Sequence, residues 1–448
     1  MVLPVRECEL SGWGRYPVQP CGVLRPDRYG DLGRLTPDIL PRGLGRSYGD
    51  SSLNQGGRVV EMTRLNRILS FDETLGILVA EAGLSLAEIA EIFLPRGWFL
   101  PVTPGTKFVT LGGAIASDVH GKNHHGEGSF SAHVLWIELF TPALGRLTCS
   151  PEENSEIFWA TAGGQGLTGI IGTVALQLKP VSSLWMEVSH HPATELESAF
   201  RLLSDPDADA PYTVAWIDCL AKGKDLGRSI FMAGHHRTEK NLPKAKAPRS
   251  KPLIQAPFDF PSGCLNALTV RAFNGVYYRL NGRKRFPFLS PMDPFFYPLD
   301  MVGHWNRIYG RRGFVQYQSV LPPDTAFEGV KAQLEEISNA GAASFLAVLK
   351  RLGAAGPGHL SFPTEGYTLA LDLPFRGSET VALLARLDTI VLKGGGRVNL
   401  CKDALLAPES FRAMYPRFEE WLAVKAQVDP EWKLQSSLSR RLRMKEGA

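Results

Sequence analysis

Apolar and polar positions follow two different periods along this chain, and together they predict a mixture of strands and helices. In the first part, short apolar runs rich in branched and aromatic residues predict strands at residues 59–62, 77–82, 98–100, 133–140 and 170–178. Residues 85–93 read instead as a helix, because Ser85 and Glu88 form a capping box ahead of apolar residues at helical spacing. A Lys-Pro pair at 179–180 closes this unit, so we expect the first domain to end near residue 185.

After residue 185 the chain carries more aromatic residues and fewer glycines, which indicates a second domain. Strands are predicted first at residues 212–219 and 229–233. A regular series follows, with strands at 314–321, 345–352, 367–373 and 397–400 and helices at 325–339 and 379–393. This order, βαββαβ, is that of the ferredoxin-like unit. A further helix is predicted at residues 417–427, and we find no internal repeat in the sequence.

Two stretches of the second domain are strongly basic. Residues 241–252 are also interrupted by proline, which predicts a mobile loop. The triplet Arg283-Lys284-Arg285 precedes an aromatic run that comprises Phe286, Phe288, Phe295, Phe296 and Tyr297. Basic and aromatic residues together suit a lipid phosphate or a membrane surface. A solvated loop anchored by its aromatic residues explains the same pattern.

Composition limits the class of protein. The chain has 448 residues, of which 44% are apolar and 21% charged, as in soluble globular proteins of two or three domains. A net charge of +4 gives no reason to expect nucleic acid as a partner. The six cysteines contain no C-x-x-C pair, which argues against a disulfide scaffold or a cysteine-rich zinc site. No secretory signal or run of 18 apolar residues occurs, so we expect a cytoplasmic protein, at most peripheral to the inner membrane.

Three glycine-dense loops of the first domain carry the candidate chemistry. In residues 40–57, a run of backbone N–H groups beside Arg42 and Arg46 can converge on a diphosphate, although the glycine spacing does not fit the Rossmann fingerprint. In residues 102–125, Gly112-Gly113 follows a predicted helix start, where a phosphate can approach backbone N–H groups. Residues 163–172 lead into a buried strand. Together the loops predict a dinucleotide in an extended conformation, whereas solvent loops and tight turns are the structural alternative.

Two other chemistries fit the sequence less well. His120, His124 and His125 have a spacing that a zinc site can use, but glycines at 121 and 126 break the helix and no carboxylate ligand is obvious. We therefore predict no metal. A serine hydrolase is disfavoured because the chain lacks a Gly-x-Ser-x-Gly elbow.

Five motifs resemble the vanillyl-alcohol-oxidase-type flavoproteins, which carry a PCMH-type FAD-binding domain. The motifs are residues 42–49, 103–106 with 112–113, 120–125, 163–169 and 413–417, and the histidine-rich one is the most specific. The resemblance implies a two-domain α+β fold. In it, residues 1–185 bind FAD, residues 186–400 form a ferredoxin-like α+β substrate domain, and residues 401–448 return to the FAD-binding domain.

The resemblance also implies a set of cofactor contacts and the mode of attachment. The residues assigned to FAD are Arg42, Gly43, Leu44, Gly45, Arg46, Ser47, Tyr48, Gly105, Thr110, Leu111, Gly112, Gly113, Ser117, Asp118, Val119, His120, Gly121, Asn123, Gly166, Ile171 and Asn399. Several relatives attach FAD through a histidine of the first loop. Arg46 takes that place here, so we expect non-covalent FAD.

Within the family, the chain is most similar to oxidases of a polyprenyl-phosphoryl ribose. These oxidise the sugar 2′-hydroxyl to a ketone by hydride transfer to flavin N5. This is the first half of a 2′-epimerisation, which a separate NAD(P)H-dependent short-chain ketoreductase completes. Lys402 is our candidate to bind or deprotonate that hydroxyl, and His120 is the second candidate. The residues assigned to substrate are Tyr48, Lys122, Trp216, Tyr297, Gln316, Gln318, Lys350, Thr368 and Lys402.

Two departures from the mycobacterial pattern leave the exact sugar open: Ala370 stands where a cysteine is expected, and Asn399 replaces a tyrosine. One alternative function is a sugar-1,4-lactone oxidase of the arabinono- or gulono-lactone type. The other is a non-catalytic scaffold with an FAD-binding fold. The lysines favour the phosphorylated substrate.

Overall fold

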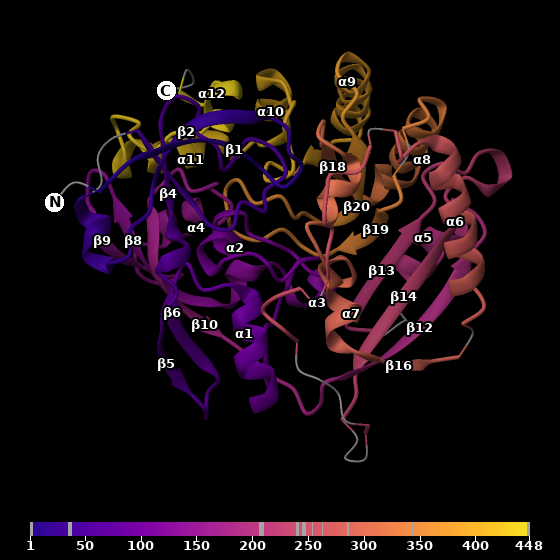
Figure 1. Ribbon diagram of the computed structural model, residues 1–448, viewed down its shortest axis with the longest axis horizontal. Helices are drawn as coiled ribbons and strands as arrows, with labels where there is room; N and C mark the ends of the chain where they lie inside the picture. The colour runs from indigo at the N-terminus through magenta and orange to yellow at the C-terminus, as the bar shows by residue number, and fades with distance from the viewer. Residues whose placement is uncertain are drawn as a thin grey trace.

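The computed structural model describes residues 3–34, 38–205, 210–238, 242–243, 248–252, 254–261, 263–284, 286–342 and 344–445. Two β-rich bodies lie side by side, the amino-terminal one in indigo and purple and the second in pink and orange (Figure 1). Parts of the basic stretches lie outside the described residues, namely residues 241, 244–247 and 285.

The first body contains two sheets. The four-stranded sheet has the order β1-β2-β4-β3 and the five-stranded sheet the order β5-β6-β10-β8-β9. The strands are β1 (Arg6–Ser11), β2 (Val18–Leu24), β3 (Ile39–Arg42), β4 (Arg58–Glu61), β5 (Ile68–Asp72), β6 (Ile77–Glu81), β8 (Val134–Thr141), β9 (Gly145–Cys149) and β10 (Ile170–Gln177). The predictions at 59–62, 77–82, 133–140 and 170–178 are confirmed. Residues 40–42, the start of the segment 40–57 that we expected to be a loop, belong to strand β3. The first glycine loop therefore begins at the edge strand of its sheet.

The helix predicted at residues 85–93 is α1 (Leu86–Phe93), and its capping box forms as expected. The Ser85 hydroxyl accepts from the backbone N–H of Glu88 at 3.2 Å, while the Glu88 carboxylate accepts from that of Ser85 at 3.0 Å. Two of the N–H groups that a helix start leaves unpaired are thereby satisfied. Leu86, Ile89 and Phe93 are buried, so α1 packs its apolar side on the body.

The second body is built on one eight-stranded sheet of order β16-β12-β14-β13-β19-β20-β18-β21. The strands are β12 (Trp185–Ala193), β13 (Tyr212–Ile217), β14 (Ser229–His236), β16 (Phe288–Pro291), β18 (Phe314–Leu321), β19 (Ala347–Leu352), β20 (Gly366–Pro374) and β21 (Arg397–Val398). The helices that accompany them are α5 (Leu196–Ser204), α6 (Ala267–Asn281), α8 (Pro323–Asn339) and α9 (Ser378–Lys393). The order β21-β18-β20-β19, with α8 and α9 between strands, confirms the ferredoxin-like unit.

The same sheet contains a duplication that the sequence did not reveal. Strand β12, α5, β13, β14, α6 and β16 repeat the βαββαβ order, and their strands take the equivalent sheet order β16-β12-β14-β13. The two units join edge to edge, where Ala215 and Trp216 of β13 pair with Leu349 and Val348 of β19.

Alternate residues of each strand face opposite sides of this sheet. On β18, Tyr317 donates to Asp388 of α9 at 3.0 Å and Ser319 donates to Gln333 of α8 at 2.8 Å. Gln316 and Gln318, which alternate with these two residues along the strand, therefore point to the other side, which faces the first body.

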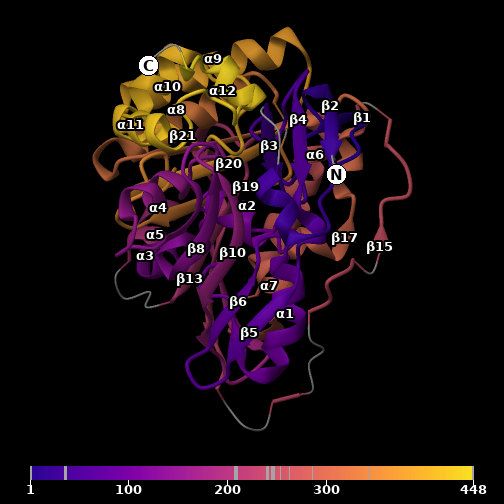
Figure 2. The same ribbon diagram turned by 90° about the vertical axis from the view of Figure 1, so that its left-hand side faces the viewer.

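The C-terminal helices α10 (Pro408–Met414), α11 (Phe418–Val428) and α12 (Ser437–Arg441) pack back on the first body (Figure 2). In α11, Trp421 donates to the carbonyl of Ala160, and the buried Lys425 ammonium donates to the carbonyls of Leu167 and Leu434 and to Asp429. The tail thus supports the third glycine loop. The division of the chain at residues 185 and 400 stays a prediction. No helix among the described residues is long and apolar enough to cross a membrane.

Candidate cofactor and substrate site

A cavity of about 510 Å³ lies between the two bodies. All three glycine-dense loops contribute to its wall, as does the face of the eight-stranded sheet that lies opposite α8 and α9. The convergence of the loops is therefore confirmed. Of the residues assigned to FAD, the wall includes Arg42, Gly43, Leu44, Gly45, Arg46, Ser47, Tyr48, Gly105, Thr110, Gly112, Gly113, Ser117, Val119, His120, Gly121, Gly166, Ile171 and Asn399. Of those assigned to substrate it includes Tyr48, Lys122, Trp216, Gln316, Gln318, Lys350 and Lys402.

The first loop presents unused backbone donors to this cavity. Within the described residues, the N–H groups of 44–47 donate to no acceptor of the protein. Gly45 takes a left-handed conformation with φ 65°, which a side chain would disfavour. Arg42 donates to the carbonyls of Ser11 and Ser52, so its guanidinium fixes the shape of the loop. A row of free N–H groups in such a turn fits the diphosphate of FAD.

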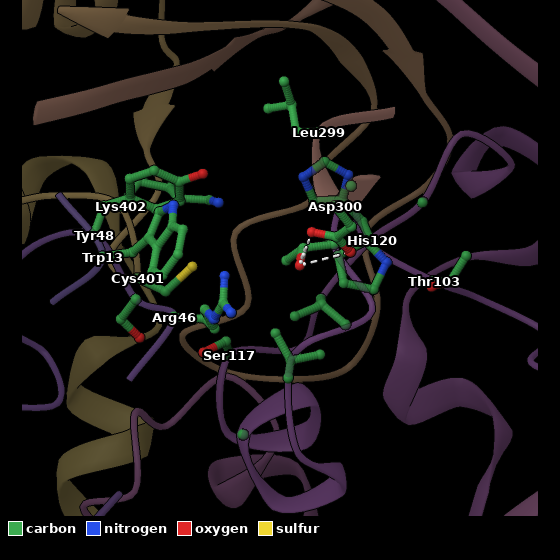
Figure 3. A pocket seen from close by; sticks show the side chains of 18 of the residues that line it. Trp13, Arg46, Tyr48, Thr103, Ser117, His120, Leu299, Asp300, Cys401 and Lys402 are labelled. Carbon is green, nitrogen blue, oxygen red and sulfur yellow. Dashed lines mark hydrogen bonds between the residues drawn. The ribbon is translucent and has the colours of Figure 1, made fainter. Parts of the chain in front are cut away.

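Arg46 adds a buried positive charge beside these donors. Its guanidinium carbon lies 3.7 Å from the ring centroid of Trp13 and 5.1 Å from that of Phe108. Burial lowers the pKa of Arg46, while nearby Asp300 opposes that shift. Figure 3 shows Arg46 between Trp13 and Ser117 on the cavity wall.

The second loop corrects one expectation. The helix α2 (Leu111–Ala116) begins with N–H groups that we expected to be open to a phosphate. Instead, the N–H of Leu111 donates to Leu84 and that of Gly112 to Ala82, while the N–H of Gly113 donates to the Thr110 hydroxyl. A Cβ on Gly112 would lie 3.1 Å from that of Ala82. Gly112 therefore lets α2 approach its neighbour closely, and the N–H groups of both glycines are already used.

Five predicted contacts lie behind the cavity wall and use their side chains within the protein. Leu111 is fully buried in the core. Asp118 accepts from the hydroxyls of Ser129 and Ser361, and Asn123 donates to the carbonyl of Pro101. Tyr297 shares a 2.7 Å hydrogen bond with Thr103, and Thr368 accepts from Gln318. These five residues do not line the cavity. A sequence motif identifies the segment that approaches the cavity, but the backbone conformation decides which of its side chains point into it.

A chain of hydrogen bonds fixes the state of His120. The backbone N–H of Cys401 donates to Asn399 Oδ1, which orients the amide so that Nδ2 donates to Gln318 Oε1 at 3.1 Å. Gln318 Nε2 must then donate, and it lies 3.0 Å from His120 Nε2. That ring nitrogen therefore accepts, and the proton resides on Nδ1, a buried atom that has no hydrogen-bond partner among the described residues. Burial, Lys350 and His124 lower the pKa of His120, so the ring is neutral.

Three lysines from separate segments point toward one region of the cavity. Burial lowers the pKa of Lys122 to about 7, with Lys350 adding to the effect. Burial and the charge of Lys402 lower the pKa of Lys350 to about 8, and burial also lowers the pKa of Lys402. Lys122 donates to the carbonyl of Phe295. Within the described part of the chain, Lys350 and Lys402 form no ion pair. An anionic ligand would supply the missing partner.

Lys402 lies in the wall of the cavity beside Tyr48. Its ammonium nitrogen is 4.2 Å from the ring centroid of Tyr48, and both line the cavity beside Trp13 and Cys401 (Figure 3). Asp372 is buried nearby. Burial raises the pKa of Asp372 to about 7, whereas a 2.5 Å hydrogen bond from Gln316 and the charge of Lys402 oppose the rise.

Several wall residues escaped the sequence analysis. Trp13, Leu299, Asp300, Trp305 and Cys401 all line the cavity. Asp300 accepts from the hydroxyl of Thr106 and from the backbone N–H of Lys107, and so anchors the loop 102–125. None of these residues belongs to a glycine-dense motif. Only Cys401 carried a signal, since it adjoins Lys402.

The three histidines of the second loop do not share a ligand. His124 Nδ1 accepts from the backbone N–H of Gly353 at 3.1 Å, and His125 Nε2 lies 3.3 Å from the carbonyl of Ala210. His120 faces Gln318. Among the described residues, no group of three or more His, Cys, Asp or Glu side chains is placed to hold a metal ion.

The model of the FAD binding domain family matches residues 36–150, which hold the first two glycine loops. The chain is 36% identical to the decaprenylphosphoryl-beta-D-ribose oxidase of Mycolicibacterium smegmatis, over 98% of each chain. It is also 36% identical to an uncharacterized protein of Streptomyces coelicolor, over 80% of this chain and all of that protein. A putative D-arabinono-1,4-lactone oxidase of Neurospora crassa is 30% identical over 33% of this chain and 26% of that protein.

Fold, cavity and family model together define an FAD-dependent oxidoreductase of the vanillyl-alcohol-oxidase type that acts on a CH–OH group. The expected resemblance and the expected cofactor FAD are thus confirmed. More narrowly, the chain belongs to the family of the decaprenylphosphoryl-beta-D-ribose oxidases.

Proposed function

We propose that this protein oxidises the 2′-hydroxyl of a polyprenyl-phosphoryl ribose to a ketone. The observation that carries the proposal is the polar end of the cavity, where Lys122, Lys350 and Lys402 converge and where Lys350 and Lys402 form no ion pair within the described chain. The phosphodiester of such a substrate would supply that charge. A relative that matches nearly the whole chain is named for this substrate class.

FAD fits the cavity through the free N–H groups of residues 44–47 and the buried Arg46, which would hold its diphosphate. When bound, FAD supplies the acceptor for a hydride. Arg46 offers no nucleophile for a covalent link at the position where several relatives have a histidine. This supports non-covalent binding.

Lys402 would take the proton of the 2′-hydroxyl as the hydride leaves C2, so that the C–O bond becomes a carbonyl. Burial lowers the pKa of Lys402, which increases the fraction of neutral amine near neutral pH. His120 would orient the sugar through its Nδ1–H, because Gln318 and Asn399 fix its tautomer. Lys350 and Lys122 would bind the phosphate and stay protonated while it is present.

Catalysis leaves a keto sugar that a separate reductase must reduce to give the 2′-epimer. We therefore propose a functional partnership with an NAD(P)H-dependent short-chain ketoreductase. Peripheral contact with the inner membrane belongs to the same proposal, because a polyprenyl substrate resides in lipid.

A sugar-1,4-lactone oxidase is the second candidate, supported by the partial match to the lactone oxidase of Neurospora crassa. A neutral lactone would leave the lysines without a partner, which favours the phosphorylated substrate. The decisive measurement is anaerobic reduction of the bound flavin by a polyprenyl-phosphoryl ribose compared with an aldonolactone. Reduction by the lactone alone would overturn the proposal, and a protein that purifies without FAD would instead fit the non-catalytic scaffold.

A further inference from the structure

The polarity of the side chains that line the cavity differs between the two halves of the sheet. In the second βαββαβ unit, Gln316, Gln318 and Lys350 face the cavity. The first unit contributes the apolar side chains of Val188, Val214, Trp216 and Met232 at the corresponding face, together with the polar His190 and Ser290. A ligand with a charged head and an apolar tail therefore has one favourable orientation. Its head lies against the second unit, and its tail lies against strands β12, β13 and β14.

Helix α6 closes the apolar half of the cavity. Its Tyr277 lines the cavity, and the Tyr277 ring centroid lies 4.5 Å from that of Trp216. The segment that follows α6 adds Lys284 and Phe288 to the wall. Figure 1 places α6 at the outer edge of the second body, so one side of the helix meets the cavity and the other faces outward.

The outward side of α6 is apolar. Leu268, Val276 and Leu280 are 77%, 56% and 57% exposed, and the exposed Ala272 continues their four-residue spacing. Phe273 is 45% exposed beside them. A helix on the surface of a soluble protein normally turns polar residues to water, whereas this one also exposes a row of apolar side chains. The exposed apolar surface continues into Phe286, which is 84% exposed, and Leu289.

The segment that forms this face carries charges of one sign only. No Asp or Glu occurs between Asp259 and Asp293 in the sequence. The basic residues of that interval that the structure describes, Arg271, Arg279, Arg283 and Lys284, are all exposed. An apolar face with a basic rim complements an anionic lipid surface, in which the apolar side chains enter the headgroup boundary and the cations meet phosphate.

We propose that the outward face of α6, together with Phe286 and Leu289, seats the protein on an anionic bilayer, and that the apolar half of the cavity receives the polyprenyl chain from that surface. This inference deepens the proposed function and rests on it for the identity of the lipid-linked substrate. It accounts for the placement of the apolar surface next to the apolar end of the cavity, which neither feature explains alone.

Vesicle binding tests the surface. The probe is vesicles of phosphatidylcholine alone or with one quarter phosphatidylglycerol, mixed with the FAD-loaded protein and sedimented. The variant Val276→Asp/Leu280→Asp reverses the apolar character of α6. The matched control, Leu75→Asp/Leu144→Asp, alters equally exposed leucines in turns of the first body. We expect binding to the anionic vesicles to fall at least tenfold in the α6 variant and to persist in the control.

Flavin content and thermal unfolding should match the parent protein in both variants, since all four positions are exposed. Unchanged vesicle binding by the α6 variant would overturn the inference. So would a parent protein that is dimeric by light scattering, becomes monomeric in the α6 variant and binds no vesicles, because a second copy would then cover the face.

Two substrates separate this inference from the proposed function. A soluble ribose phosphodiester with one isoprene unit should reduce the flavin equally in parent and α6 variant, whereas a long-chain substrate embedded in vesicles should react at least tenfold more slowly with the variant. If neither substrate reduces the parent flavin, the proposed function fails, while the vesicle-binding result still decides the membrane surface.

Discussion

Replacement of Lys402 by methionine tests the chemical core of the proposal. Methionine keeps most of the volume and apolar length of the side chain but removes the amine that lies 4.2 Å from the Tyr48 ring centroid. The substitution leaves the free N–H groups of the first loop untouched, so FAD should remain bound. If Lys402 is the base, the limiting rate of flavin reduction falls by a factor of about 10² to 10⁴, which corresponds to about 3–5 kcal/mol in activation free energy.

A purely binding role for Lys402 predicts a different result. A hydrogen bond to a charged group is worth about 1.5–3 kcal/mol, so the substrate Kd would rise by a factor of about 10 to 150 with an unchanged limiting rate. Lys350→Met is the matched comparison, because Lys350 also lacks an ion pair in the described chain and faces the same cavity. We expect Lys350→Met to change Kd and Lys402→Met to change the limiting rate.

Anaerobic stopped-flow measurement of flavin absorbance over a range of substrate concentrations separates these two quantities. In the parent protein the limiting rate should rise with pH through the ionisation of the base, and this rise should be absent in Lys402→Met. A variant that keeps the parent limiting rate and its pH profile would remove Lys402 from the chemistry. Equal flavin content in both variants guards against loss of the cofactor as the cause.

Three further results are expected. Gly45→Ala should destabilise the protein by about 1–2 kcal/mol and lower its FAD content, because φ is 65° and the new Cβ would clash with the guanidinium of Arg42. Thermal unfolding and flavin absorbance measure the two effects. Lys425→Met should cost about 3–5 kcal/mol in chemical denaturation by leaving the buried carboxylate of Asp429 without its cation, and adding Asp429→Asn should recover part of that loss. Substrate binding at pH 8 should take up protons and should weaken as the pH rises further, because the phosphate raises the pKa values of Lys122 and Lys350 from about 7 and about 8. Calorimetry in buffers of different ionisation enthalpy measures this proton uptake. The uptake would be absent if these lysines do not bind the phosphate.

Local signals in the sequence were sufficient for many elements. Strand β18 (Phe314–Leu321) has the predicted bounds, and α1 begins at its capping box. Both signals involve residues close together in the chain, so they do not depend on the rest of the fold. The order of the elements between residues 314 and 398 also identified the ferredoxin-like unit.

The first βαββαβ unit was largely missed, and α6 shows why. Its outward face is apolar, so the helix lacks the alternation of a polar and an apolar side on which prediction depends. The duplication itself became visible only from the pairing of β13 with β19. Similar topology does not require similar sequence.

The sequence by itself predicted that three glycine-dense loops serve a flavin nucleotide and that lysines serve the substrate. Tertiary structure decided which groups are available. The N–H of Gly112 donates to the carbonyl of Ala82, whereas the N–H groups of residues 44–47 have no acceptor among the described residues. Lys122, Lys350 and Lys402 line the same cavity although they are far apart in the chain. The reason is physical: a residue type fixes what a group can bind, but its free donors, its burial and therefore its pKa depend on neighbours that only the folded chain brings together.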